Sequence, residues 1–303
     1  MLLLCMFPCL VIALTYLLSV LVTYFASGGY YQLGNVWSQS MPVFLDMAPF
    51  VLGGVAIWFF IAYFANTAII RSATGARTLS RKENKRVYNL VENLCIAQGM
   101  NMPLVNVIED DSLNAYASGI NDKTYTVSLS RGIINKLNDN ELEGVIAHEL
   151  AHIRNRDVRL LIISIVFVGI FAMLMQIAFR ALLYSPGRSR NKDGKGTIVV
   201  VVIALIVATI GYFFTMLMRF AISRKREYLA DAAAAEMTQQ PQALANALRK
   251  ISGNPNIQSI TRDDVAQLFI EHPLRKDKMF AGISGLFATH PPIKKRIEIL
   301  EQF

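Results

Sequence analysis

Charged side chains are absent from the first 45 positions of this chain, and only 17% of its 303 residues are charged. Hydrophobic residues make up 53% of the sequence. This composition excludes an ordinary soluble enzyme, because a soluble domain needs enough polar surface to face water. The sequence therefore predicts segments that lie in a lipid bilayer.

Cysteine is scarce as well, with three residues in the whole chain. Cys5 and Cys9 lie in the first apolar run, and Cys95 lies on the apolar side of a predicted helix. Their number and spacing exclude a disulfide framework and match no cysteine-based zinc motif. We interpret all three as small hydrophobic residues.

Motifs that combine aromatic and basic residues for nucleic-acid binding are missing, although the net charge is +8. Many of the basic residues instead follow or flank apolar runs. Basic residues beside a membrane segment favour contact with anionic lipid. We therefore expect this protein to contact a lipid bilayer. We do not expect it to bind nucleic acid.

Four uncharged stretches are long enough to cross a hydrocarbon core of about 30 Å. They comprise residues 1–25, 47–70, 160–179 and 196–218. A cleaved signal peptide is the alternative for the first stretch, but no basic residue precedes it and it contains no clear cleavage site. Buried core helices are the alternative for the last two, but 20 and 23 uncharged residues are long for such helices. We expect about four transmembrane helices.

The loops predict the orientation of these helices. Residues 26–46 contain no Lys or Arg, whereas basic residues crowd the chain after the second stretch, which predicts that this later side is cytoplasmic. The loop between the third and fourth stretches disagrees, since Arg188, Arg190, Lys192 and Lys195 would then face outward. Either the rule fails at this loop or the hairpin does not fully cross the membrane.

Histidine occurs only four times, and two of the four fall within one HELAH sequence. On a helix, the step from His148 to His152 places both imidazoles on one face, about 6 Å apart, within reach of a single zinc ion. Glu149 lies beside them and could take a proton from a bound water. Asn138 and Glu141 form a capping-box pattern that predicts where this helix starts. The pattern indicates a zinc hydrolase rather than a chance match.

A catalytic zinc needs a third protein ligand and one open position. Glu227 and Asp231 are four residues apart in the later segment SRKREYLAD, so they share a helix face. Glu227 could bind the metal while Asp231 accepts the outer N–H of a ligand histidine. An acidic pair at this spacing is usually a solvated face, but its pairing with HELAH favours the metal site. We hypothesise that the helices of the third and fourth stretches continue out of the membrane to the ligands.

The region between the second and third stretches has a mixed helix and strand pattern. A helix is predicted at residues 80–99, followed by strands at 104–108, 114–118 and 125–129. Later helices are predicted at residues 242–251, 263–270 and 293–301. The predicted parts are two N-terminal transmembrane helices (1–70), a cytosolic part with the HELAH helix (71–159), a transmembrane hairpin (160–218) and a cytosolic part with the third ligand (219–303).

Taken together, the motifs NAYASG, HELAH, SRKREYLAD and THPPIKKRI closely resemble those of the HtpX heat-shock membrane proteases. These proteases belong to the gluzincin clan and are relatives of the CAAX prenyl proteases. The resemblance implies an α-helical membrane protein with a mainly α (α+β) zinc-metalloprotease domain and a short β-sheet edge at the active site. It also implies a location in the cell inner membrane, an active site that faces the cytoplasm, and cleavage of misfolded or damaged membrane proteins under stress.

Carried over to this chain, the resemblance implies one zinc ion bound by His148, His152 and Glu227, with Glu149 as the base. The NAYASG segment would form an active-site edge strand whose residues bind substrate, namely Asn114, Ala115, Tyr116 and Ala117; an ordinary strand is the alternative. His290 would lie beside the zinc and could stabilise an oxyanion. A surface histidine before a proline turn is the alternative for His290.

Three rival functions remain at this stage. A scaffold with a purely structural zinc needs a fourth ligand, but Cys95 is the only thiol outside the first apolar stretch. A transporter is disfavoured because the four stretches contain no ionisable residue of the kind that marks an ion path. A CAAX-type prenyl-peptide protease is disfavoured because four spans make a smaller chamber. The sequence gives no oligomeric state.

Overall fold

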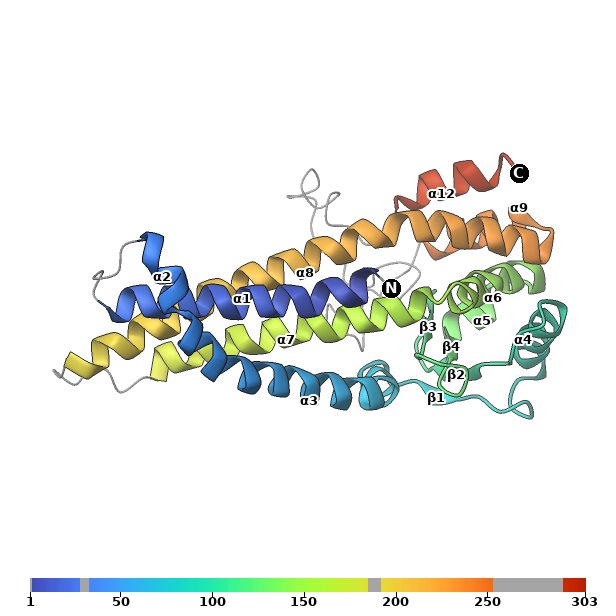
Figure 1. The fold of residues 1–303 in the computed structure, drawn as a ribbon. Coiled ribbons are helices and arrows are strands. Elements are labelled where there is room, and N and C mark those ends of the chain that lie inside the picture. Colours follow the sequence, from blue (N-terminus) through green and yellow to red (C-terminus); the bar gives the residue numbers. More distant parts are fainter. Residues whose placement is uncertain (1, 28–32, 185–191, 253–290) are drawn as a thin grey trace. The chain divides into compact units, whose positions relative to one another are not determined.

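The computed structural model describes residues 2–27, 33–184, 192–252 and 291–303, and Figure 1 shows its elements. The chain divides into two compact units. The first contains residues 1–63 and 164–218, and the second contains residues 64–163 and 219–303. Most described residues are helical, and one small sheet lies in the second unit. The prediction of a mainly helical protein with a short sheet is therefore confirmed.

The first unit is built from long apolar helices. It contains α1 (Leu2–Ala26), α2 (Leu33–Gln39), most of α3 (Met41–Thr74) and parts of α7 (Asp157–Tyr184) and α8 (Lys192–Thr238). Phe7 of α1 packs edge-on against Phe171 of α7, with ring centroids 5.9 Å apart. Contacts of this kind join helices that are far apart in the sequence.

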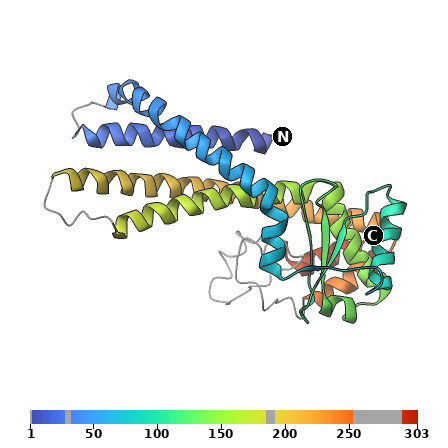
Figure 2. The same ribbon diagram turned by 90° about the horizontal axis from the view of Figure 1, so that it is seen from below.

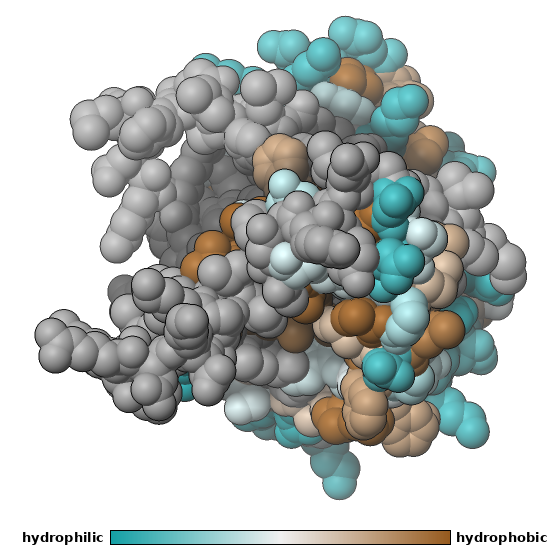
Figure 3. Space-filling view, turned by 60° about the vertical axis from the view of Figure 1, so that its left-hand side comes forward, coloured by the Kyte–Doolittle hydropathy of each residue, from teal (hydrophilic) through white to brown (hydrophobic). Residues whose placement is uncertain are grey.

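Among the described residues, two helices are long and apolar enough to cross a membrane, α1 over Phe7–Tyr24 and α3 over Met41–Ala65. Only 6% of the α3 window is buried, and its large side chains Phe50, Ile57 and Phe60 are exposed. Figure 3 shows apolar side chains, in brown, at the surface. An exposed apolar face of this length needs lipid around it. Residues 160–179 and 196–218 are helical in α7 and α8, while the total of four spans stays a prediction.

The second unit contains a four-stranded sheet in the order β1–β2–β4–β3. Its strands are β1 (Arg77–Thr78), β2 (Leu104–Ile108), β3 (Ala115–Ser118) and β4 (Thr126–Ser130). β2 and β4 are parallel, and the outer strands pair with them antiparallel. β3 is therefore an edge strand, and the three predicted strands are confirmed within one residue at each end.

Helices pack around this sheet and form the core of the second unit. They are α4 (Lys85–Ala97), α5 (Arg131–Lys136), α6 (Asp139–Arg154), α9 (Pro241–Ile251) and α12 (Ile293–Leu300). α6 packs against α4, α9 and β3, and α9 packs against α12. Figure 2 shows α6 beside the strands of the sheet. Gly144 allows α6 to pack closely against α9, since a Cβ there would lie 3.2 Å from Leu244 of α9.

The boundaries differ from the predicted ones where short polar interactions decide them. α4 begins at Lys85 rather than residue 80 because the side chain of Asn84 accepts a hydrogen bond from Val87 N. The short elements α2, β1 and α5 were not predicted, because two to seven residues carry too little periodicity. The helix predicted at residues 263–270 lies outside the described residues.

The basic residues that follow α3 are largely engaged within the second unit. Arg77 pairs with Glu83 and Glu109. Arg86 pairs with Asp139 of α6 and donates to the carbonyl groups of Ile134 and Leu137. This positive charge, which the sequence suggested for lipid, therefore also holds α4 against α5 and α6.

The two segments that carry the predicted metal ligands differ in whether the long apolar helix continues to the ligands. α8 is one continuous helix of 47 residues, as hypothesised. For the HELAH helix the hypothesis of a continuous helix is wrong, because α6 ends at Arg154 and α7 starts at Asp157. Arg156 between them has a left-handed backbone with φ of 59°, which a right-handed helix does not accept.

Gly119 provides a test of the turn that joins β3 to β4. Its φ is 110°, and an added Cβ would lie 2.4 Å from the carbonyl oxygen of Thr124. We expect Gly119→Ala to lower the free energy of unfolding by about 3 kcal/mol or more, from strain and overlap together. Gly99→Ala is the control, because Gly99 has φ of 62° but open space around its Cβ position. For Gly99→Ala the free energy of unfolding should fall by only about 1 kcal/mol. Equal melting temperatures of the two purified variants would contradict this account.

Candidate active site

The HELAH helix α6 starts at the predicted cap. The side chain of Asn138 accepts a hydrogen bond from Glu141 N, and the Glu141 carboxylate accepts one from Asn138 N. Lys250 of α9 also binds the Glu141 carboxylate, 2.7 Å away. The cap and this ion pair fix the start of α6, and the helical repeat then places His148 and His152 on one face.

The two imidazoles converge on one point. His148 Nε2 and His152 Nε2 lie 3.2 Å apart, and the ring planes are nearly perpendicular at 86°. His148 is buried with 1% exposure, and the His152 side chain is 15% exposed. The nitrogens that face each other therefore leave both Nδ1 atoms free to bind other groups.

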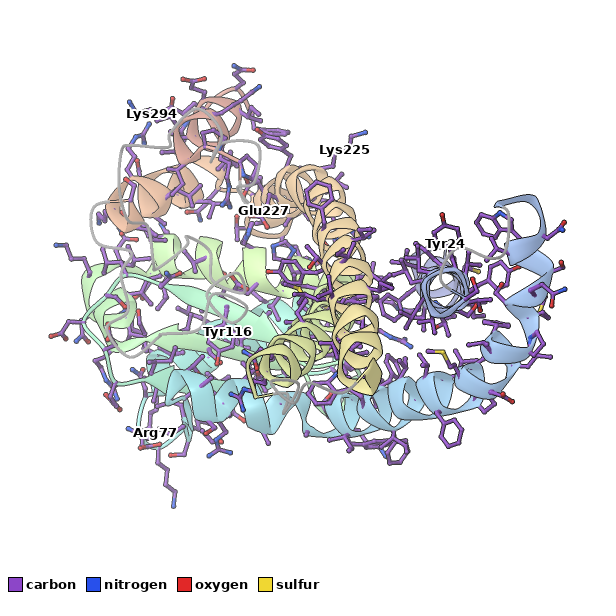
Figure 4. The ribbon with its side chains drawn as sticks, turned by 90° about the vertical axis from the view of Figure 1, so that its left-hand side faces the viewer. Tyr24, Arg77, Tyr116, Lys225, Glu227 and Lys294 are labelled. Atoms are coloured by element: carbon purple, nitrogen blue, oxygen red, sulfur yellow. The ribbon has the colours of Figure 1, made fainter. Side chains whose placement is uncertain are left out.

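Glu227 of α8 reaches the same point. Its carboxylate oxygens lie 3.4 Å from His152 Nε2 and 3.8 Å from His148 Nε2. Figure 4 shows Glu227 directed toward α6, whereas Lys225 points away. One potential ligand atom from each of the three residues can be chosen so that all three atoms lie within 4.8 Å of one another. Zinc bonds of about 2.0–2.2 Å in tetrahedral geometry would separate ligand atoms by about 3.4 Å, so the donor set fits this ion.

Asp231 lies one helical turn after Glu227 and contacts the far side of His148. Its Oδ1 atom is 3.0 Å from His148 Nδ1. Both acidic side chains are buried, with residue exposures of 4% for Glu227 and 2% for Asp231. The alternative of a solvated acidic face is therefore wrong.

Arg296 of α12 is the buried cation of the site. Its guanidinium binds both oxygens of Asp231, at 2.8 and 2.7 Å, and lies 3.3 Å from Glu227 Oε2. Burial raises the pKa of Asp231, but the charge of Arg296 and a hydrogen bond from His148 outweigh it and lower that pKa. Burial in turn lowers the pKa of Arg296, but the Asp231 carboxylate outweighs it and raises that pKa. Both groups are therefore charged.

Asp157 provides a second carboxylate, on His152. Its Oδ2 atom lies 3.2 Å from His152 Nδ1, and its Oδ1 atom accepts a hydrogen bond from Arg226 of α8. Burial lowers the pKa of His152, but the hydrogen bonds to Asp157 and Glu227 and the Glu227 charge outweigh it and raise the pKa to about 10. Each histidine thus has its own carboxylate partner on Nδ1.

Sequence reasoning missed Asp157, Arg226 and Arg296. Arg296 carries a sequence signal, since it lies four residues before Leu300 on the apolar face of α12, where a charged residue is unexpected. No sequence signal marks Asp157 or Arg226. Asp157 lies after the end of the HELAH helix, and Arg226 lies in a run of basic residues.

Glu149 is buried with 2% exposure on α6, and its negative charge acts on both His152 and Arg296. Four carboxylates (Glu149, Asp157, Glu227 and Asp231) and two guanidinium groups thus meet in this cluster. With neutral histidines, the cluster has an excess of two negative charges. A divalent metal ion would balance that excess.

The predicted substrate strand packs against α6 as β3. Asn114 pairs with Ser130 of β4: Ser130 N donates to the Asn114 carbonyl oxygen, and Asn114 N donates to the Ser130 side-chain Oγ. Because bonded pairs alternate along an antiparallel ladder, the backbone groups of Ala115 and Ala117 point away from β4. Ala115 N donates to the Asn114 side chain. The strand is nonetheless buried, with exposures of 0% to 4% from Asn114 to Ser118.

The Tyr116 side chain has a structural partner. Its hydroxyl lies 2.8 Å from Thr74 Oγ1, near the end of α3, and the residue is 1% exposed (Figure 4). Its ring is therefore part of the core. His290 lies outside the described residues.

Comparison with known proteins places this site in a family. The model of Peptidase family M48 matches residues 81–303, which include every residue of the cluster. The chain belongs to peptidase family M48. As an M48 member it is a metallopeptidase, so the scaffold and transporter alternatives are wrong.

Several M48 relatives match over most of their length. A Protease HtpX homolog of Bacteroides fragilis is 65% identical over 303 residues, covering 99% of this chain and 94% of the relative. Protease HtpX homologs of Dictyoglomus turgidum and Listeria monocytogenes are 41% and 37% identical and cover 82% and 81% of this chain, and 81% and 83% of the relatives. The resemblance to the HtpX proteases is confirmed, and this M48 peptidase is a membrane-bound metalloprotease.

The crystal structure of S. mikatae Ste24p is among the solved structures that match the chain. It is 19% identical with a TM-score of 0.47 and covers 87% of this chain. The present chain spans 65% of the length of that protein.

The raised pKa of His152 predicts that metal binding releases a proton. Metal and proton compete for Nε2, and a pKa of about 10 keeps that nitrogen protonated at pH 8. We expect about one proton from His152 per metal ion, and apparent affinity that falls about tenfold for each unit of pH below 9. Calorimetric titration of the purified protein with Zn²⁺, in two buffers of different ionisation enthalpy, measures the release. Identical heats in both buffers would contradict it.

Proposed function

We propose that this M48 peptidase is a zinc endopeptidase with one zinc ion per chain, held by His148, His152 and Glu227. The observation that carries the proposal is the convergence of these three donors, two buried and one half-buried, at distances that suit tetrahedral zinc. Two imidazoles and one carboxylate suit zinc among the common metals. Three protein ligands leave a fourth position open, as hydrolysis requires.

The residues around the ligands divide the chemistry between them. Bound zinc supplies a Lewis acid that polarises the scissile carbonyl and makes water more acidic. Glu149 takes the proton of the attacking water and returns it to the leaving amine. Asp231 holds His148 in the tautomer that leaves Nε2 free for the metal. His290 is proposed, from the resemblance alone, as a donor to the oxyanion.

We propose that substrate binds along the outer edge of β3 in the described sheet, at Asn114, Ala115, Tyr116 and Ala117. An extended peptide that adds to an edge strand gains main-chain hydrogen bonds whatever its sequence, which suits a protease of damaged proteins. The backbone of Ala117 provides such bonds on the side away from β4. Because β3 is buried, a peptide reaches this edge only if a neighbouring segment moves.

The proposed substrates are misfolded or damaged proteins of the cell inner membrane. Support comes from the apolar helices of this chain and from the name Protease HtpX homolog of its relatives. We further propose a multi-pass topology of about four spans with the active site on the cytoplasmic side. The absence of Lys and Arg from residues 26–46 and their abundance after α3 support that orientation.

Glu149→Gln tests the proposed chemistry. The change removes the base but no ligand, so zinc should stay near one per chain while casein cleavage falls below a few per cent. His148→Ala, His152→Ala and Glu227→Ala should each lose zinc as well as activity. Glu143→Gln is the control, because Glu143 lies on α6 outside the metal-ligand cluster, and it should keep both. Cleavage by Glu149→Gln at the rate of the parent protein would exclude Glu149 as the base.

Fusions to alkaline phosphatase test the topology, because that enzyme is active only outside the cytoplasm. A fusion after Lys82 should be inactive, and a matched fusion after Ser27 should be active. The opposite pattern would place the metal site outside the cytoplasm.

A further inference from the structure

We propose that Asp157 and Arg226 form a positioning pair that orients His152 for the metal and ties it to the helix that carries Glu227. The inference rests on the proposed function, because it takes His152 Nε2 as a metal ligand. It assigns a role to two residues that lie outside the HELAH motif and outside the Glu227–Asp231 pair.

The first step is the hydrogen bond on the far side of His152. Asp157 Oδ2 lies 3.2 Å from Nδ1, while Nε2 faces Glu227 and His148. A carboxylate can only accept from Nδ1, so it keeps a proton there. When a metal displaces the Nε2 proton, the Nε2 lone pair then faces that metal. Asp231 has the same relation to His148. A carboxylate oxygen therefore lies within about 3 Å of Nδ1 on each ligand imidazole.

The second step is the break between α6 and α7. Asp157 follows His152 by five residues. In a continuous helix the two side chains would therefore lie about 140° apart around the axis, and Asp157 would face away from the imidazole. The left-handed backbone of Arg156 interrupts the helix and returns the Asp157 carboxylate to the imidazole. The same break makes Asp157 the first residue of α7.

The third step is the ion pair between Asp157 and Arg226. Arg226 directly precedes Glu227 on α8, and its guanidinium binds the Asp157 oxygen that His152 does not contact. The Asp157 side chain is 11% exposed and that of Arg226 is 28% exposed, so water screens this pair less than a surface pair. The Arg226 guanidinium thus connects Asp157, which contacts His152, to α8, the helix that carries Glu227.

The alternative role for Asp157 is purely structural, as a negative charge at the N-terminus of α7. Such a charge stabilises a helix but has no effect on a metal. A second ion pair distinguishes the two roles. Arg154 of α6 and Glu236 of α8 also link the two ligand-bearing segments, with their charged groups 3.9 Å apart. Arg154 also donates to Gln98, so neither of its contacts is a metal ligand.

The test measures zinc affinity of the purified full-length protein by competition with a chelator of known affinity. Asp157→Asn should weaken binding about 10- to 100-fold, because an amide can no longer hold the Nδ1 proton by charge. Arg226→Gln should weaken it about 3- to 10-fold, since Asp157 remains in place. In the double variant the Arg226 change should add less than twofold, because it acts through Asp157. The visible spectrum of the cobalt-loaded variants should shift from that of the parent protein.

Arg154→Gln and Glu236→Gln are the controls, since they remove the same types of charge from the same segments. Zinc affinity of both control variants should stay within twofold of the parent value. Their cobalt spectra should not change. Parent-like affinity in Asp157→Asn, or in Arg226→Gln if the first variant does not fold, would overturn the positioning role. Failure of the parent protein itself to bind zinc would instead overturn the proposed function.

Discussion

A charge buried away from water needs a counter-charge, and this constraint organises the second unit of the protein. Four carboxylates and two guanidinium groups surround two imidazoles, and they come from α6, from the start of α7, from α8 and from α12. No one of these elements could bury its charged residues alone. The remaining negative excess suits a divalent ion, so the fold and the chemistry of a metallopeptidase depend on the same balance.

Local patterns were enough to predict one side of this cluster. His148, Glu149 and His152 follow from the helical repeat, and the Asn138–Glu141 cap located the start of their helix within a residue. Glu227 and Asp231 could be paired with them because one acidic pair at helical spacing accompanied one histidine pair. The strands were recognised for the same reason, since alternation and turn residues act over a few positions.

The remainder depended on contacts that no local pattern encodes. Arg296 meets Asp231 across 65 residues, and Arg226 meets Asp157 across 69. The position of Asp157 depends on a single left-handed residue, Arg156, at a point where the sequence contains no glycine or proline to mark a break. The burial of β3 is equally non-local, because α6 and the rest of the sheet pack against this strand, and its local sequence predicts only that it is extended.

The buried guanidinium of Arg296 also affects when the site can assemble during synthesis of the chain. A ribosome makes His148 148 residues before Arg296, and it makes Glu227 and Asp231 before α12 as well. Until α12 has been added, the acidic side chains of α8 lack the partner that permits their burial. The Glu227 and Asp231 carboxylates therefore gain their buried guanidinium partner only after the last described helix has been made, so the order of translation delays assembly of the complete site.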